Sequence, residues 1–271
     1  MAEFIQATIE LYKQALQATV RSFLRGWIMT FVVVGFAMLM LVVSLLVSSL
    51  GMLGGLLAGA ANAFIIGATL YLIEQVVLGA RTIQWSDIPH SAGQYFWDVI
   101  SVGFLVWFPL MMLQMALQAN PYRPVLTTAV FFLVFVLLNP VPEVIYQRRQ
   151  GSAMDVVRES YEFVLENWIE WFLPIAILLA PFGLTFFFEF SSQAGMRGGL
   201  DFFQIFTVPF RVLTGWVQYL GISSAGSSLL IILCTPILGV FMLIFRGHLF
   251  TALHGSSRRQ RRFQARARPH S

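Results

Sequence analysis

The residues best suited to chemistry are four carboxylates and one guanidinium that interrupt otherwise apolar stretches of the chain. Glu74, Asp98, Glu143 and Glu170 each fall within about two helical turns of one end of an expected membrane span, and Arg246 has a similar depth in the last span. An ionised side chain costs about 2.5–3.5 kcal/mol at the centre of a membrane helix and much less near its ends. Two interpretations stay open: a shared polar vestibule in which Arg246 neutralises Glu143 or Glu74, or separate side chains that each reach headgroups and water.

Glu143 has the most unusual surroundings of the four, because it ends the string Asn139-Pro-Val-Pro-Glu143. Two prolines remove backbone donors and free the carbonyls upstream, so this helix is expected to be kinked or unwound here. Broken helices beside buried carboxylates form ion and substrate sites in transporters. Prolines are also common in membrane helices generally, so the motif fits either a binding site or a bend.

A second pattern is a row of small residues four apart, formed by Gly55, Gly59, Ala63 and Gly67. This spacing places all four on one face of a helix, where another helix can approach closely. We interpret the row as a helix-packing face within one chain. A contact between two copies of the chain is the alternative.

The third feature is a basic segment, residues 256–271, that directly follows the last apolar run. Its arginines at the start, Arg258, Arg259, Arg261 and Arg262, are candidates for contact with anionic phospholipid headgroups. The alternative is a disordered segment that only fixes the orientation of the last span. A nucleic-acid partner is not expected, because no folded nucleic-acid-binding module accompanies these charges.

Known catalytic and metal-binding motifs are absent from the sequence. There is no HExxH, GxSxG, phosphate-binding loop or GxGxxG string, and His90, His248 and His254 lack ligand spacing. The sequence therefore predicts no catalytic residue, no metal and no cofactor. An enzyme is not expected.

The composition indicates that the elements positioning these residues are membrane helices. Charged residues make up 11% and hydrophobic residues 58% of the chain, whereas soluble domains carry about 25% charged residues. Six apolar runs of about 22 residues are each long enough to cross a bilayer core of about 30 Å. They are Trp27–Leu50, Leu56–Leu78, Phe96–Gln118, Val125–Tyr146, Trp168–Phe188 and Ser227–Phe250. The expected fold is an all-α polytopic bundle of three transmembrane hairpins, a single membrane domain over residues 1–255.

Basic residues indicate how this bundle is oriented. Most of them, from Lys13 to the arginines of residues 256–271, fall on one side of the expected spans, and the other side has only Arg123, Arg197 and Arg211. The positive-inside rule then places both termini in the cytoplasm, and a bacterial inner membrane is the expected location.

A repeat connects the three hairpins. Trp27, Trp97 and Trp168 each open the first helix of a pair, and amphipathic helices precede the first and third. The repeat-like units are 1–81, 82–150 and 151–255. Alternatively, the tryptophans reflect only the preference of this side chain for membrane interfaces. Residues 200–220, between the last two spans, are expected to lie on the surface or re-enter the membrane, although a seventh span would also fit.

The layout resembles a group of bacterial six-span proteins. This group includes the membrane domain fused to some glycerophosphodiester phosphodiesterases and the YciC-type inner-membrane proteins. The resemblance rests on the paired helices and on the helix starts Phe23-Leu-Arg-Gly-Trp27 and Val164-Leu-Glu-Asn-Trp168. No phosphodiesterase domain is present in the chain, so that activity is not implied, and the group supplies no functional residues.

Two functions are compatible with this sequence. The first is a non-enzymatic membrane protein that organises lipid, a membrane-protein partner or another copy of itself at the cytoplasmic face. The second is a small transporter or channel with a site near the broken fourth helix. A continuous polar cavity at Glu143 would favour transport, and a dry packed interior would favour organisation.

Overall fold

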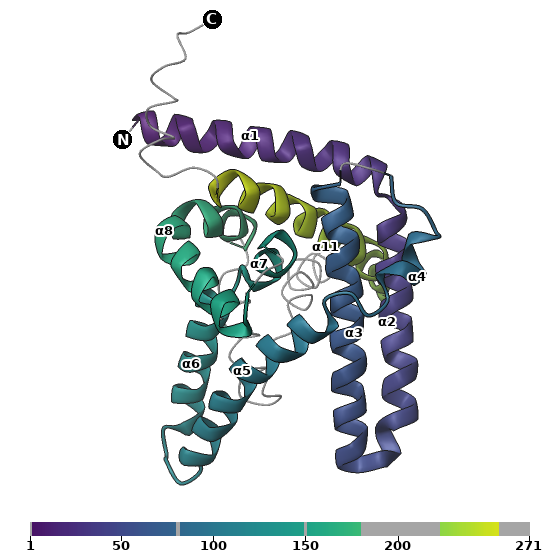
Figure 1. Cartoon of the computed structure of the whole chain (residues 1–271), viewed down its shortest axis with the longest axis vertical. Coiled ribbons are helices and arrows are strands. Elements are labelled where there is room, and N and C mark those ends of the chain that lie inside the picture. The colour runs from purple at the N-terminus through teal and green to yellow at the C-terminus, as the bar shows by residue number, and fades with distance from the viewer. Residues whose placement is uncertain (1, 80–81, 149–150, 180–222, 255–271) are drawn as a thin grey trace, which may run out of the picture.

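A computed structural model describes residues 2–79, 82–148, 151–179 and 223–254, and every regular element in these ranges is a helix (Figure 1). The elements are α1 (Ala2–Arg25), α2 (Ile28–Val47), the short 3-10 turn η1 (Ser48–Leu50), α3 (Gly51–Val77), α4 (Asp87–Ser91), α5 (Phe96–Ala116), α6 (Arg123–Leu137), α7 (Val141–Arg148), α8 (Ala153–Leu179) and α11 (Ser224–His254).

Five helical stretches are long and apolar enough to cross a membrane. They are Ile28–Leu50, Leu53–Val77, Phe96–Ala116, Arg123–Arg148 and Leu233–His254. This result confirms the expectation of a helical protein with several helices suited to a multi-pass membrane arrangement. The expected fifth span, Trp168–Phe188, begins within α8 and continues beyond the described residues. Residues 200–220 and the basic segment 256–271 also lie outside the described part of the chain.

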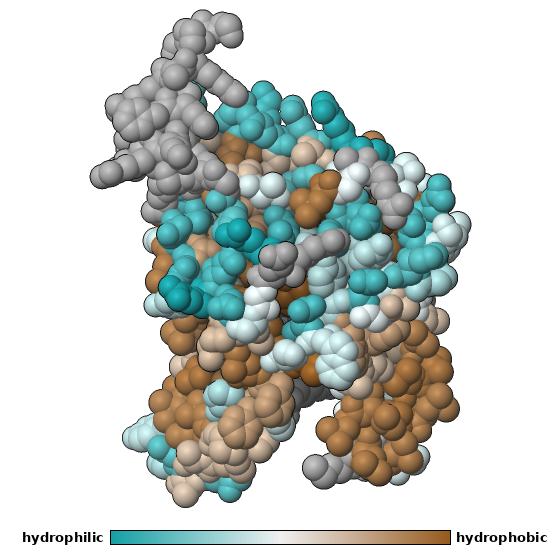
Figure 2. Space-filling model, in the orientation of Figure 1, coloured by the Kyte–Doolittle hydropathy of each residue, from teal (hydrophilic) through white to brown (hydrophobic). Residues whose placement is uncertain are grey.

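The helices form two apolar limbs joined to a more polar body. The pair α2–α3 makes one limb and the pair α5–α6 the other, while α1 lies across the opposite end of the molecule (Figure 1). Hydrophobic side chains cover the limbs, and hydrophilic side chains gather on the body, as Figure 2 shows. Apolar limbs suit a hydrocarbon environment because their helices satisfy their own backbone hydrogen bonds.

The core consists of two hydrophobic clusters, and α11 contributes to both. The first cluster joins α2, α3 and α7 to α11 around Tyr146 and Ile244. The second joins α1, α7 and α8 to α11 around Trp171 and Phe250. The ring of Phe163 contacts the rings of both Trp171 and Phe250, with centroid distances of 5.2 Å and 4.5 Å. The second half of α11 is therefore the most enclosed helix among those described.

Two helix breaks fall at corresponding positions of the first and third expected units. One is the turn at Gly26 and Trp27 between α1 and α2, and the other is Asn167, whose φ of −127° and ψ of 19° interrupt α8 just before Trp168. At the first break a Cβ on Gly26 would lie 2.9 Å from Val76. Each break lies directly beside a tryptophan, Trp27 in one case and Trp168 in the other.

The row of small residues on α3 divides into two halves. Ala63 is buried, and a Cβ on Gly67 would lie 2.4 Å from the carbonyl oxygen of Gln94. The chain bends tightly at this contact, where Tyr95 has a φ of 55°. By contrast, Gly55 and Gly59 are exposed, and no atom lies within 4 Å of a Cβ built on either. The expected packing face is thus present only at Ala63 and Gly67 within the described structure.

Helix α1 packs on α11 through small and polar side chains and through the ring of Phe23, whose centroid lies 5.7 Å from that of Phe241. Thr8, Ala15, Thr19 and Ser22 are buried, and the Ser22 hydroxyl lies 3.0 Å from Nε2 of His248. The hydroxyl of Tyr12 donates to the carbonyl oxygen of Glu170 on α8. Burial, with a further contribution from the negative charge of Glu170, raises the pKa of the Tyr12 hydroxyl far above its ordinary value. Tyr12 is thus a neutral hydrogen-bond donor.

Several other large apolar side chains of α1 are exposed. These exposed residues are Ile9, Leu16, Val20 and Leu24, and Trp27 in the following turn is exposed as well. Helix α1 therefore has a small-residue face on the body and an adjacent apolar face that the described residues leave uncovered.

Candidate functional site

The candidate site lies where the fourth apolar stretch is broken into α6 and α7. Pro140 and Pro142 supply no backbone N–H, and the chain turns through a hydrogen bond of 3.2 Å from the nitrogen of Val141 to the carbonyl of Leu138. The break confirms the predicted interruption of this helix. It also leaves the carbonyls of Leu137 and Asn139 available to neighbouring helices.

Both carbonyls accept hydrogen bonds from other parts of the chain. The hydroxyl of Ser160 on α8 donates to Leu137 at 3.3 Å, and Nη2 of Arg246 on α11 donates to Asn139 at 2.7 Å. The unwound segment is therefore held from two sides. Such partners are needed because an unpaired carbonyl buried away from water is costly.

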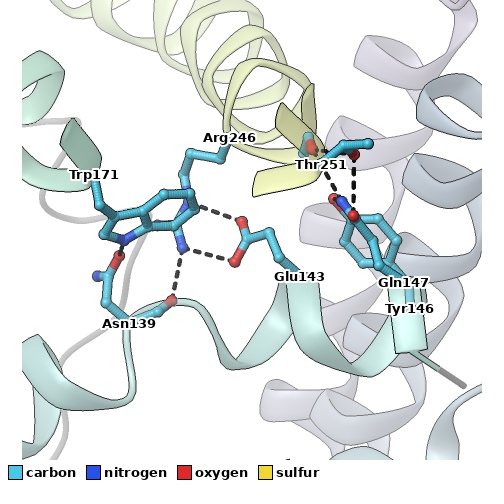
Figure 3. A network of polar contacts seen from close by, with 8 residues as sticks. Asn139, Glu143, Tyr146, Gln147, Trp171, Arg246 and Thr251 are labelled. Carbon is cyan, nitrogen blue, oxygen red and sulfur yellow. Dashed lines mark hydrogen bonds and ion pairs between the residues drawn. The ribbon is translucent and has the colours of Figure 1, made fainter. Parts of the chain in front are cut away.

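Arg246 and Glu143 form a bidentate ion pair at the centre of the site (Figure 3). Nε of Arg246 donates to Oε1 of Glu143 at 2.8 Å, and Nη2 donates to Oε2 at 2.9 Å. Glu143 is 1% exposed and Arg246 is 3% exposed. Charges buried this deeply are tolerated when they are paired with good geometry and additional hydrogen bonds.

Trp171 on α8 contacts both Asn139 and the Arg246 member of the pair. Its Nε1 donates to Oδ1 of Asn139 at 2.9 Å, and its ring lies under the guanidinium of Arg246, with Cζ 4.9 Å from the ring centroid (Figure 3). The aromatic face adds a cation–π attraction to the ion pair. One indole thus fixes the amide of Asn139 and covers one side of the guanidinium.

A second set of polar contacts continues along α7 and α11. Nε2 of Gln147 donates to the carbonyl of Gly247 at 2.9 Å, and the hydroxyl of Thr251 donates to Oε1 of Gln147 at 3.0 Å (Figure 3). A Cβ on Gly247 would lie 2.5 Å from the hydroxyl oxygen of Tyr146, so the two helices cross where only glycine fits. This close crossing places Arg246 at hydrogen-bonding distance from Glu143.

The other predicted acidic residues occupy different surroundings. Glu74 is buried on α3 and accepts a hydrogen bond of 2.8 Å from the hydroxyl of Tyr95. Glu170 is buried on α8, whereas Asp98 is exposed on α5. Of the two partners considered for Arg246, the structure therefore selects Glu143. Because Asp98 is exposed and the other three carboxylates are buried, the described residues do not form a vestibule shared by all four.

Sequence reasoning missed the neutral members of this site. Trp171, the side chain of Asn139, Gln147 and Tyr95 were not predicted to take part. Asn139 could have been found, because it precedes the two prolines that were recognised. Trp171 carries no such signal, since aromatic residues are frequent throughout this chain.

The site as built can hold helices together more readily than it can carry out a reaction. The charges of Glu143 and Arg246 neutralise each other, and both side chains are enclosed by protein. No group of three His, Cys, Asp or Glu side chains within the described ranges is placed to hold a metal ion.

Comparison with known proteins assigns no family to this chain. No family model, no curated protein and no solved structure matches it.

Proposed function

We propose that this chain is a non-enzymatic integral membrane protein that organises lipid or a protein partner at one membrane face. The observation that carries the proposal is the uneven distribution of polarity. Apolar limbs suited to the bilayer project from a body that carries the polar surface (Figure 2). The buried charges of Glu143 and Arg246 within that body are paired with each other, which favours a packed interior over a polar passage.

In this proposal the chain crosses a bacterial inner membrane six times as three hairpins, with both termini in the cytoplasm. Two observations support this topology. The basic residues predominate on one side of the expected spans. In addition, α1 packs on the second half of α11 through Ser22 and His248, which puts both ends of the described chain at the same end of the molecule (Figure 1).

Helix α1 is the main lipid-contacting element of the proposed face. Its uncovered apolar residues, such as Leu16 and Val20, would enter the boundary between headgroups and acyl chains. Lys13, Arg21 and Arg25 are exposed beside this face and would attract anionic headgroups. A relationship to the YciC-type proteins, which the sequence resembles, belongs to the same proposal.

The proposal is tested by asking which lipids stay with the purified protein. Full-length chain in nanodiscs of mixed phosphatidylethanolamine and phosphatidylglycerol is expected to retain the anionic lipid preferentially when analysed by native mass spectrometry. The triple change Lys13→Gln, Arg21→Gln and Arg25→Gln should reduce this preference, whereas the control Gln14→Ala and Gln17→Ala should preserve it. If photo-crosslinkers at Leu16 capture neither lipid nor protein in cell membranes, the proposal is wrong.

Transport remains a second candidate because a proline-broken helix lies directly beside a buried carboxylate. In this case the Arg246–Glu143 pair would have to open for an ion or substrate to reach the carboxylate. Vesicles containing the protein would then show a flux that Glu143→Gln abolishes. If flux is equal in the two proteins, Glu143 is not a transport site.

A further inference from the structure

A groove lies between the first half of α8 and the ends of α7 and α11, apart from the Glu143 site. Its volume is about 460 Å³, within the range of typical ligand pockets. Phe163 and Leu253 provide buried apolar walls, and Asn167 closes the groove at the break in α8. His254, the last described residue of α11, also lines it. Hydrophilic side chains gather over α7 and α8 in the view of Figure 2.

One wall of this groove is a row of carboxylates along α8. Asp155, Glu159, Glu162 and Glu166 line the groove, and their spacing of four, three and four residues places them on one helix face. The row extends about 16 Å along the helix at 1.5 Å per residue.

The basic residues of the groove do not balance this row. Arg148 pairs with Glu159, and Arg158 pairs with Glu162 at 2.7 Å. Glu166 is exposed, and its charge acts on the nearby His254. Nε2 of His254 also lies 3.3 Å from Glu159, but burial and then the charge of Arg148 lower the pKa of His254, which favours its neutral form. Four carboxylates then face two guanidiniums, so the groove has an excess of negative charge and suits a cationic occupant.

The chain itself supplies such an occupant immediately beyond His254. Residues 255–271 contain six arginines and no acidic residue, and the first four arginines fall between Arg258 and Arg262. Four residues of extended chain reach about 13–14 Å, which is close to the length of the carboxylate row. A segment joined to the groove through His254 also has an effective concentration of about millimolar at that site.

We propose that Arg258–Arg262 docks in the α8 groove, with its guanidiniums on the carboxylate row and Phe263 near the apolar walls. Exposed ion pairs are individually weak, so docking depends on several pairs acting together with the covalent connection. Docked arginines are not available to lipid headgroups. The groove is thus the binding site of a basic peptide segment, and the segment is the chain's own continuation.

Cysteine crosslinking tests this docking in the full-length protein. The single cysteine is first removed by Cys234→Ser, and Gln260→Cys is then combined with Glu166→Cys in the groove. The matched control combines Gln260→Cys with Tyr161→Cys, because Tyr161 is exposed on another face of α8. A short bismaleimide is applied in vesicles of phosphatidylcholine and in vesicles that also contain phosphatidylglycerol, with each cysteine normalised by its labelling with a monomaleimide.

Docking predicts that the groove pair crosslinks on the order of tenfold faster than the control pair in both kinds of vesicle, since a docked segment has a higher local concentration there. Changing Arg258, Arg259, Arg261 and Arg262 to Glu should reduce the groove pair to the control rate. Equal rates for the two pairs would overturn the proposal and indicate an undocked segment. Loss of the difference in phosphatidylglycerol vesicles would also overturn it, with anionic lipid as the occupant. Retention of fast crosslinking after the charge reversal would exclude the carboxylate row as the docking surface.

Discussion

The guanidinium of Arg246 and the carboxylate of Glu143 are joined by two parallel hydrogen bonds across 103 residues of sequence. This contact fastens α11 to α7, and both helices have buried residues in each of the two hydrophobic clusters of the described core. Because Trp171 and the carbonyl of Asn139 also contact the guanidinium, α8 and the broken segment are tied to the same point. The ion pair is therefore the point at which α7, α8, α11 and the broken segment before α7 are joined.

The first prediction concerns removal of one charge from this pair. Arg246→Leu should lower the free energy of unfolding by about 3–5 kcal/mol, because it leaves the Glu143 carboxylate buried without a partner. The double change Arg246→Leu and Glu143→Leu should be less destabilising than Arg246→Leu alone. Both are measured by reversible unfolding in mixed micelles. Equal losses in the single and double variants would show that the pair is not coupled.

The second prediction concerns the indole of Trp171. Trp171→Phe keeps an aromatic ring under Arg246 but removes the donor to Asn139, which should cost about 1–3 kcal/mol for the unsatisfied amide oxygen. Trp168→Phe is the control, because Trp168 is exposed and should be close to neutral. Thermal unfolding followed by tryptophan fluorescence compares them. A neutral Trp171→Phe would mean that the hydrogen bond contributes little.

The third prediction separates crowded glycines from open ones. Gly67→Ala and Gly247→Ala should destabilise the fold, since the added methyl groups would lie 2.4 Å from the Gln94 carbonyl and 2.5 Å from the Tyr146 hydroxyl. Gly59→Ala should instead stabilise its helix by about 0.5–1 kcal/mol, because it meets no atom and alanine is the better helix former. Unfolding midpoints of the three variants test this order. A loss of self-association in Gly59→Ala would support a contact between two copies.

The fourth prediction is a pH dependence at the start of α8. Ser152 and Asp155 form a reciprocal cap, in which the Ser152 nitrogen donates to Oδ2 of Asp155 at 2.8 Å and the Asp155 nitrogen donates to the Ser152 hydroxyl at 3.3 Å. Hydrogen bonds from the hydroxyl and the backbone of Ser152 lower the pKa of Asp155.

A lowered pKa fixes the direction of the effect. The cap stabilises α8 at pH values above the unfolded-state pKa of Asp155, and this contribution disappears as the pH falls through the lower folded-state pKa. Amide hydrogen exchange in the first turn of α8 should therefore show less protection at acidic than at neutral pH, after correction for the intrinsic rate. Asp155→Ala should remove the difference. An unchanged pH profile in Asp155→Ala would assign the effect to other groups.

Some of the site could be predicted from the sequence because it depends on local chemistry. The prolines at 140 and 142 have no backbone donors in any fold, so the interruption near Asn139 was predictable and is confirmed. The boundary between the first two helices was predictable as well, because Trp27 was expected to open the first span, and the turn lies at Gly26 and Trp27. Local rules of this kind do not require knowledge of neighbouring helices.

The partner of Arg246 could not be chosen in the same way. Glu143 and Glu74 were equally acceptable from depth alone, and the choice depends on how α11 is rotated against α7 and α3. That rotation follows from contacts such as Gly247 on Tyr146, which join residues about a hundred positions apart. The exposure of Gly55 and Gly59 could not be predicted either. Their spacing identifies one face of α3, but it does not show which parts of that face another helix or loop covers.

The long separation between Glu143 and Arg246 has a consequence for biogenesis. At about 5–20 residues per second, the ribosome adds Arg246 about 5–20 s after Glu143. Throughout that interval the nascent chain contains an acidic group whose cation has not been synthesised. A chain that stops before Arg246 can bury its fourth apolar stretch only with Glu143 unpaired, and such products would be recognisable to membrane quality control. Stable burial of the fourth apolar stretch therefore depends on completion of α11.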